Sequence, residues 1–359
     1  MCSRQASDDE AADKRTKRSK RVLKRKDEQR ESKMDKSITQ LDIDEIRSFY
    51  RQSDGRQKRF RTIFDEFQRR LSDTYGITLP PGVRRLGRNM YQEINSDTPY
   101  VLEFIVSELL EKLGKTHETI EILNPEGMYN LCVGIGRTSA AKQENKQNQN
   151  ARPYAFQKII VKGDVGSFYG GMPIDRYLIH HIRGSVGRSF MDNAKQGKII
   201  VDNVADESAA QVNSGARFLF KDYVGPRLGW GQRGGSIVTL KNLPFNAGLF
   251  AAGGTILTLG DEIDEEIGSG MLEGRNYTPR THRNIGGRDA GVRPVGPEDY
   301  RFIAEALNPF IEELDIATQG RGRISQELFN ETNPALSING MSYDFSRYHV
   351  VVPKRTLQD

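Results

Sequence analysis

The sequence predicts a mainly β protein organised around a right-handed parallel β-helix of about six coils between residues 157 and 276. Short β-branched runs recur there at an interval of about 19 residues, which is too short for two parallel strands joined by a crossover helix. Glycines precede most of these runs, and short strands separated by glycine turns are typical of solenoid coils. We therefore expect an α-helical region only before this stretch and a helical segment after it.

The β-branched runs define the predicted strands. Alternate side chains of each run should point inward and stack from coil to coil, because no single coil can bury its own apolar face. The spacing is even except for one longer step before Ile199. The runs are Ile159-Ile160-Val161, Tyr177-Leu178-Ile179, Ile199-Ile200-Val201, Phe218-Leu219-Phe220, Ile237-Val238-Thr239-Leu240 and Ile256-Leu257-Thr258-Leu259.

Glycines at repeated positions predict the corners of the coils. Glycine reaches φ > 0 without a Cβ clash, so sharp turns between strands collect it. We expect structural corners at Gly163, Gly166, Gly171, Gly184, Gly187, Gly197, Gly215, Gly225, Gly235, Gly248 and Gly254.

The chain before the solenoid is predicted to contain a basic tail and a helical region. Residues 1–37 include many basic and few apolar side chains, and such a composition is typical of a disordered segment. Within residues 38–150, apolar side chains recur at helical spacing in 38–71, and Ser96-Asp97-Thr98-Pro99 signals a helix over 99–113.

Two further features complete this N-terminal region. Leu131-Cys132-Val133 is expected to form a short strand, and the polar residues 141–152 are interpreted as a linker to the solenoid. The solenoid domain is accordingly assigned to residues 151–276.

Residues 277–359 are predicted to be an extended arm followed by a C-terminal cap. The stretch 274–297 is rich in Gly, Arg and Pro, which favours an arm, and 298–314 is a helix candidate interrupted at Asn308-Pro309. Tyr348-His349-Val350-Val351-Val352 is expected to be a strand added to a sheet edge.

The two ends of a β-helix expose unpaired backbone groups and an apolar column, so both ends should be covered. We expect Leu102, Ile105 and Leu109 of the helix over 99–113 to cover the first coil. At the other end, the apolar side chains of residues 300–311 are expected to cover the coil that contains Ile256.

Composition predicts a cytoplasmic protein without a membrane span. The formal net charge is +5, the first residues are charged, and no apolar run approaches the roughly 18 residues of a membrane helix. Cys2 and Cys132 are the only cysteines, which excludes a disulfide framework and a cysteine-based zinc or iron–sulfur site within the chain. We expect no cofactor and no metal site.

Three stretches of the repeat resemble a known family. They read GDVGSFYGG at 163–171, NSGAR at 213–217 and AGLFAAGGTI at 247–256. Together they are similar to the GXGXG β-helix, which forms the C-terminal part of the glutamate synthase large subunit and makes up one of the subunits of formylmethanofuran dehydrogenases. The resemblance implies a non-catalytic role, as a rigid spacer in the first case and as a scaffold in the second.

Few residues point to catalysis, and the catalytic residues are left unknown. In glutamate synthases a cysteine at the mature N-terminus is the nucleophile, but Cys2 lies on the basic tail with no partner to lower its pKa. His180 and His181 are adjacent, so in a strand they face opposite ways and cannot bind one metal together. His282 and His349 are distant in sequence. The glycines of Gly134-Ile135-Gly136 lack the context of a phosphate loop and favour a corner.

Charged groups suggest binding surfaces. The acidic residues of 261–266 form either a carboxylate or cation site, or a solvated corner that docks a basic partner. The arginines of the arm either contact a phosphate or carboxylate partner or are solvated. These arginines are Arg275, Arg280, Arg283, Arg288 and Arg293.

Three functions remain open. The first is a structural or scaffold protein within a larger oxidoreductase-type assembly, or a homo-oligomer, without catalytic residues of its own. The second is a hydrolase that acts along a solenoid groove and needs two carboxyl groups about 5–10 Å apart. The third is a protein that binds nucleic acid or another polyanion through the basic residues 14–36.

Overall fold

The computed structural model describes most residues between 158 and 357 and a smaller set before them. The described residues are 38–46, 48, 69, 72–73, 106, 110, 113, 117–126, 128, 131–132, 158–170, 178–280, 285–287, 289–318, 322–325, 329 and 335–357. The predicted tail, residues 1–37, and the predicted linker, residues 141–152, lie outside the described residues.

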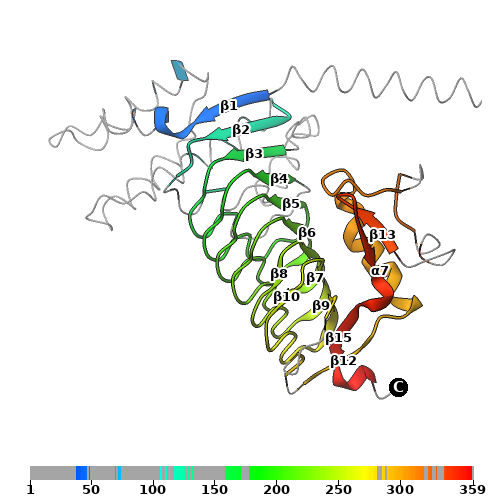
Figure 1. Ribbon diagram of the computed structural model, residues 1–359. Helices are drawn as coiled ribbons and strands as arrows, with labels where there is room; N and C mark the ends of the chain where they lie inside the picture. The colour runs from blue at the N-terminus through cyan, green and yellow to red at the C-terminus, as the bar shows by residue number, and fades with distance from the viewer. Residues whose placement is uncertain are drawn as a thin grey trace, which may run out of the picture.

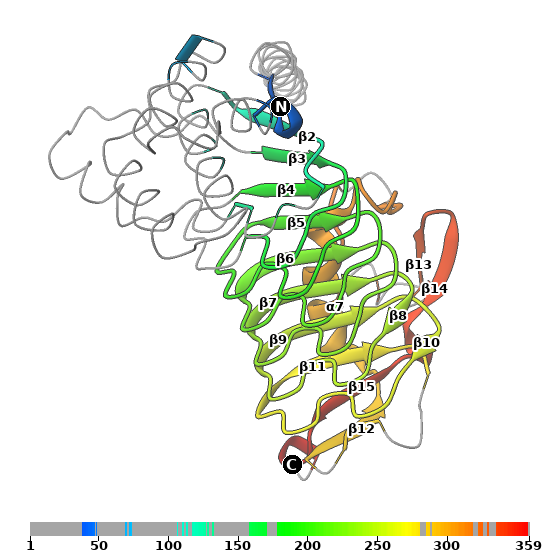
Figure 2. The ribbon, with the colours of Figure 1, turned by 90° about the vertical axis from the view of Figure 1, so that its left-hand side faces the viewer.

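The fold is a mainly β protein built on a parallel β-solenoid of about six turns, which confirms the predicted fold class (Figures 1 and 2). One face of the solenoid is a continuous sheet in which the strands from β1 to β11 pair in parallel. These strands are β1 (Ile38–Asp42), β2 (Thr119–Leu123), β3 (Lys158–Lys162), β4 (Ile179–Ile182), β5 (Lys198–Val201), β6 (Ser214–Phe220), β7 (Arg233–Thr239), β9 (Ala252–Thr258) and β11 (Glu273–Thr278).

The register of the strands corrects one predicted run. Lys158 pairs with Ile179, and Ile179 pairs with Lys198, so the longer step precedes β4 rather than β5. The run equivalent to residues 159–161 is 180–182, so the predicted run at 177–179 is misplaced by three residues. The polar His180-His181 pair lies in the middle of β4, and its polarity hides the strand from a search for apolar runs.

Two strands replace predicted helical sequence in the N-terminal region. Residues 38–42 form β1 instead of the start of a helix, and β1 pairs in parallel with β2. The strand expected at 131–133 is wrong at Leu131 and Cys132, which form a turn, while β2 lies earlier in the chain. Pairing with β3 extends the sheet through both strands, so tertiary context overrides the helical spacing of the apolar residues.

A helical stripe packs onto this end of the solenoid. Val106, Leu110 and Leu113 are helical and buried, in agreement with the predicted helix over 99–113. They belong to the same apolar cluster as Leu41 of β1 and Ile120 of β2. The stripe expected to cover the first coil, Leu102, Ile105 and Leu109, lies outside the described residues.

The interior of the solenoid is one apolar column. Inward side chains alternate along each strand, and partners in register stack from coil to coil. Aromatic rings fill part of this column, where Tyr169 and Phe190 stack with ring centroids 5.5 Å apart. The central members of the column are Ile159, Ile199, Phe218, Ile237 and Ile256, all of them buried.

Corner residues with a left-handed backbone conformation stack from coil to coil, and this conformation does not require glycine in every coil. Met191 and Ala210 take φ of 56° and 58° at a position where other coils place glycine, such as Gly248 with φ of 66°. A left-handed L-residue costs roughly 1–2 kcal/mol. The coil geometry offsets this cost with backbone hydrogen bonds between turns, such as Met191 N to Tyr169 O at 2.7 Å.

The predicted corner glycines fall into two structural groups. Those with left-handed or otherwise positive φ are Gly163, Gly197, Gly235, Gly248 and Gly254. Gly184, Gly187, Gly215 and Gly225 do not take positive φ; a Cβ at each of these four would overlap the backbone of the preceding coil. Close approach between coils, rather than a left-handed turn, therefore requires glycine at these four. Gly166 has no positive φ, and Gly171 lies outside the described residues.

The expected extended arm instead contains two strands of the sheet. The predicted solenoid boundary at residue 276 cuts β11, and β12 (Ala290–Pro294) follows. The predicted C-terminal edge strand is confirmed as β15 (His349–Pro353), which inserts antiparallel between β11 and β12. These two antiparallel pairings close the last coil of the solenoid.

The C-terminal helical segment covers a flank of the solenoid, not its end as expected. It comprises η1 (Pro297–Asp299), α7 (Tyr300–Leu307) and η2 (Asn308–Phe310), so the predicted interruption at Asn308-Pro309 is confirmed as a change to 3₁₀ geometry. α7 contacts β7 and β9 (Figure 1). Its apolar face forms a second core with the outward side chains of the sheet.

That second core makes the sheet apolar on both faces. Outward residues Leu219, Val238 and Leu257 are buried against Ile303 and Leu307 of α7. The shorter elements are β8 (Asn242–Leu243), β10 (Glu262–Ile263), β13 (Ala335–Ile338), β14 (Met341–Asp344), η3 (Phe345–Arg347) and η4 (Lys354–Leu357). Within the described part of the chain, no helix has the length and apolar character needed to cross a membrane.

Valine at a left-handed glycine should destabilise the fold. In Gly235→Val and Gly254→Val the new side chain would meet Ala216 O and the Gln232 side chain, respectively, at a φ that valine disfavours. We expect each variant to lose about 1–3 kcal/mol of unfolding free energy or more, measured by thermal or denaturant unfolding. The exposed Lys241→Ala is the control. Equal stability of all three would contradict the assigned corner geometry.

Candidate functional site

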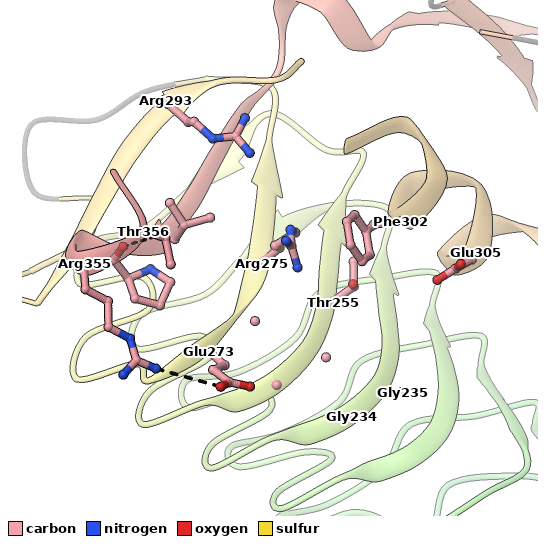
Figure 3. Close-up of a pocket in the computed structure, with 15 residues that line it drawn as sticks. Gly234, Gly235, Thr255, Glu273, Arg275, Arg293, Phe302, Glu305, Arg355 and Thr356 are labelled. Carbon is pink, nitrogen blue, oxygen red and sulfur yellow. Dashed lines mark hydrogen bonds and ion pairs between the residues drawn. The ribbon is translucent and has the colours of Figure 1, made fainter. Parts of the chain in front are cut away.

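A groove of about 670 Å³ lies between the sheet and the C-terminal segment (Figure 3). Its floor is formed by the glycine-rich starts of β7, β9 and β11, and its walls by α7, β12, β15 and η4. The charged and aromatic side chains that line it are Glu273, Arg275, Arg293, Phe302, Glu305 and Arg355. It is the candidate site because it gathers charged side chains from four segments that are separated in sequence.

The floor of the groove is bare backbone because the strands bulge there. Gly235, Gly254 and Gly274 have φ of 70°, 83° and 99° and occupy equivalent positions in three successive strands. The register shifts at these points, as in a β-bulge, which favours glycine. The buried Gln232 amide donates to Gly234 O at 3.0 Å and fixes one of these bulges.

A fully buried carboxylate, Asp299, holds one wall together. Arg293 donates to it twice, at 2.6 and 3.1 Å, in a bidentate ion pair. Tyr277 O–H and Gly296 N–H donate to it at 2.9 and 3.0 Å. Burial, followed by the charge of Asp299, raises the pKa of Tyr277 far above its ordinary value. Asp299 thus connects β11, β12 and the start of α7, and all its contacts serve the fold.

Arg275 is fixed in orientation but lacks hydrogen bonds. Its guanidinium carbon lies 3.8 Å from the centroid of the Phe302 ring, a cation–π contact. Its Nε lies 3.9 Å from Asp299 Oδ1 and is buried without a hydrogen-bond partner. Within the described part of the chain, the guanidinium donates no hydrogen bond. This is the one predicted arm arginine that is both held in place and unsatisfied among the described residues.

The other charged side chains of the groove differ in whether they have a counter-ion. Arg355 donates to Leu272 O and lies 3.9 Å from Glu273, so this pair is partly neutralised. Glu305 is exposed on α7 one turn beyond Phe302, and no ion pair forms to it from the described residues. Among the described residues, Glu305 is therefore the groove charge without a counter-ion, and the counter-ion of Arg275, Asp299 at 3.9 Å, is already hydrogen-bonded by Arg293.

A second polar cluster is buried inside the solenoid. His180 Nδ1 and the Tyr169 hydroxyl are 3.0 Å apart, and His180 Nε2 has no partner in the described structure. Burial lowers the pKa of His180 to about 3. Burial, then the neighbouring Cys132 thiol, raises the pKa of Tyr169. The pair is neutral at physiological pH and contributes to the core rather than to a groove.

The adjacent histidines face opposite sides of the sheet, as predicted. His180 points into the core, whereas His181 lies on the outer face with its Nε2 2.9 Å from Asp202 Oδ2. His349 lies in β15, and His282 lies outside the described residues. Among the described residues, no three His, Cys, Asp or Glu side chains are placed to hold a metal ion.

The remaining predicted site residues are dispersed. The acidic residues of 261–266 form an exposed corner, where Glu262 accepts from Tyr223, Asp264 caps Phe245 N, and Asp261 pairs with Arg280 at 3.1 Å. Cys2, Gly134, Gly136, Arg283 and Arg288 lie outside the described residues.

Sequence reasoning missed most of the groove. It proposed Arg275 and Arg293, but not Phe302, Glu305 or Asp299, which come from a helical segment interpreted as a cap. The one available signal was the pair of glycines repeated at 234–235 and 253–254, directly before two predicted strands.

No protein-family model matches the chain, and a search of curated proteins finds no significant match. The resemblance to the GXGXG β-helix therefore stays a prediction, carried by the three stretches quoted above.

Replacing the buried carboxylate should weaken the groove wall strongly. Asp299→Asn leaves Arg293 and Tyr277 facing an uncharged group, and we expect a loss of about 3 kcal/mol of unfolding free energy, measured by denaturant unfolding. Glu298→Gln is the matched control, because it removes an exposed partner of the same arginine at 3.1 Å and should cost less than about 1 kcal/mol. Equal losses would show that Asp299 does not hold the wall.

The buried histidine should make the protein acid-sensitive. Its folded pKa of about 3 lies below the ordinary value of 6.5, so between these pH values only the unfolded chain binds the proton. Stability from this site is complete above about pH 6.5 and falls by up to about 1.4 kcal/mol per pH unit below it. Asp192 acts with the opposite sign, because burial raises its pKa to about 6.

The double variant Tyr169→Phe with His180→Leu isolates this effect. It removes both polar groups together, so its stability relative to the natural chain should rise as the pH falls from 6.5 to about 4. His181→Gln on the outer face is the comparison and should show a smaller change, because burial lowers the pKa of His181 but Asp202 opposes that shift. Parallel pH–stability curves for the double variant and the natural chain would contradict the burial of a neutral histidine.

Proposed function

We propose that this protein is a structural and interaction protein whose solenoid is a rigid scaffold that presents the groove to a protein partner. The observation that carries the proposal is the pre-organised state of the groove. Arg275 is held by Phe302, and Arg293 by Asp299, before any ligand arrives. Groups already fixed in position lose little conformational entropy on binding, which favours recognition.

The architecture supports a scaffold role. The sheet is packed on both faces, by the solenoid interior and by the C-terminal segment, and backbone hydrogen bonds connect each coil to the next. Such a stack resists bending because every coil is restrained by two neighbours. On the resemblance alone, the partner belongs to a larger oxidoreductase-type assembly, and a homo-oligomer is the alternative.

One observation favours a second candidate, hydrolysis in the groove. Glu273 and Glu305 both line it, from opposite sides of the glycine floor (Figure 3). Two carboxyl groups in one groove are the requirement of a glycoside hydrolase. The third candidate, binding of a polyanion through residues 14–36, concerns residues outside the described structure.

Affinity capture with a groove variant tests the proposal. The tagged full chain, expressed at native abundance, should retain a stoichiometric partner, and Arg275→Gln should weaken this retention by about tenfold or more. Arg217→Gln is the matched control, since Arg217 is exposed in the same outward column of the sheet but outside the groove.

A partner retained equally by both variants would overturn the groove as its binding site, and no partner at all would overturn the scaffold role. Turnover of a polysaccharide by the purified chain, abolished by Glu305→Gln and by Glu273→Gln, would establish the hydrolase instead.

A further inference from the structure

We infer that the groove recognises a side-chain carboxylate of an extended peptide segment through Arg275, with Glu305 accepting a basic side chain of the same segment. The inference rests on the proposed function in one respect, that the groove is the partner site. It adds the chemistry of the partner: an acidic and a basic residue that point to the same side of one strand-like segment.

Charge pairing in the groove singles out Arg275. Asp299 is already bound by Arg293 in two hydrogen bonds and by two further donors, so it has little capacity left for Arg275 at 3.9 Å. Glu298 also pairs with Arg293, at 3.1 Å. The Nε of Arg275 is buried without a hydrogen-bond partner, and no described residue accepts a hydrogen bond from its Nη groups, so the guanidinium can still donate to an acceptor on a ligand.

The geometry of Arg275 suits a carboxylate. Contact with the Phe302 ring fixes the guanidinium beside α7 and above the glycine floor, where no side chain from Gly254 or Gly274 intrudes (Figure 3). Its Nε edge faces Asp299, so the Nη groups are left for a ligand. Arginine donates to carboxylates and phosphates through two parallel hydrogen bonds, and a planar carboxylate matches this fork.

The exposed carboxylate of Glu305 favours a carboxylate over a phosphate as the group bound by Arg275. Glu305 lines the same groove without a counter-ion among the described residues, so it would repel a dianionic phosphate more than a singly charged carboxylate. Glu305, which no described residue neutralises, instead attracts a cation on the ligand. The ligand is thus dipolar.

The open floor and the two charges indicate an extended peptide. Arg275 lies against Phe302, and Glu305 lies three residues beyond Phe302 on α7, so both charges border the glycine floor of one groove. In an extended chain, side chains two residues apart lie on one side. One strand-like segment can therefore present an acidic residue to Arg275 and a basic residue to Glu305, and the bare backbone floor leaves space for the peptide main chain.

Titration of the full-length chain with blocked tripeptides tests this inference. The probe is Ac-Glu-Gly-Lys-NH₂, and binding is followed by calorimetry and by the Nε–Hε NMR signal of Arg275. We expect saturable binding that weakens by about tenfold or more in Arg275→Gln and with Ac-Gln-Gly-Lys-NH₂. Glu305→Gln and Ac-Glu-Gly-Gln-NH₂ should weaken it by a smaller factor, and Arg217→Gln should leave it unchanged.

Three results would overturn the inference. They are no saturable binding of the tripeptide, equal binding by Arg275→Gln and the natural chain, or preferential binding of inorganic phosphate at Arg275. The signal of Arg275 in the natural chain keeps the test decisive should a variant unfold. A partner that is captured in an Arg275-dependent manner, while the tripeptide does not bind, would leave the scaffold proposal standing and reject the dipolar peptide.

Discussion

The backbone hydrogen bonds between successive coils are the constraint on which the rest of the structure depends. Each coil must return to the same place after about 19 residues, because its strand pairs in register with the strands before and after it. Corners that satisfy this closure are left-handed at fixed positions, and the chain accepts the strain even at Met191 and Ala210. The hydrogen bonds and the buried apolar column offset that strain together.

Closure also determines where glycine is needed. At Gly215 and Gly225 the problem is the approach of neighbouring backbones, and at Gly235 and Gly254 it is the left-handed bulge. The bulged positions stack because the coils stack. They therefore produce a continuous floor without side chains, and the groove exists because of the same repeat that builds the solenoid.

The groove acquires its chemistry from the C-terminal segment. A sheet with apolar residues on its outer face must be covered, and α7 covers it only in part, so its edge places Phe302 and Glu305 beside the glycine floor. Asp299 connects the segment to β11 and β12, and its ion pair with Arg293 neutralises the charge of that arginine. Arg275 is left fixed and unsatisfied. Because Asp299 is occupied by Arg293, the neighbouring Arg275 remains available to bind a ligand.

The sequence by itself determined the solenoid, because its evidence is local: β-branched runs and glycines recur at one interval, and each coil repeats the same short-range geometry. It also determined the helix that changes at Asn308-Pro309 and the terminal strand. It failed at β4, where two histidines interrupt the apolar run, and at β1 and β2, whose stability comes from pairing with strands far along the chain. Only the tertiary structure decided that α7 covers a flank and that Arg275, Phe302 and Glu305 line one groove, because side chains from separate segments are brought together by packing and ion pairing that no local pattern encodes.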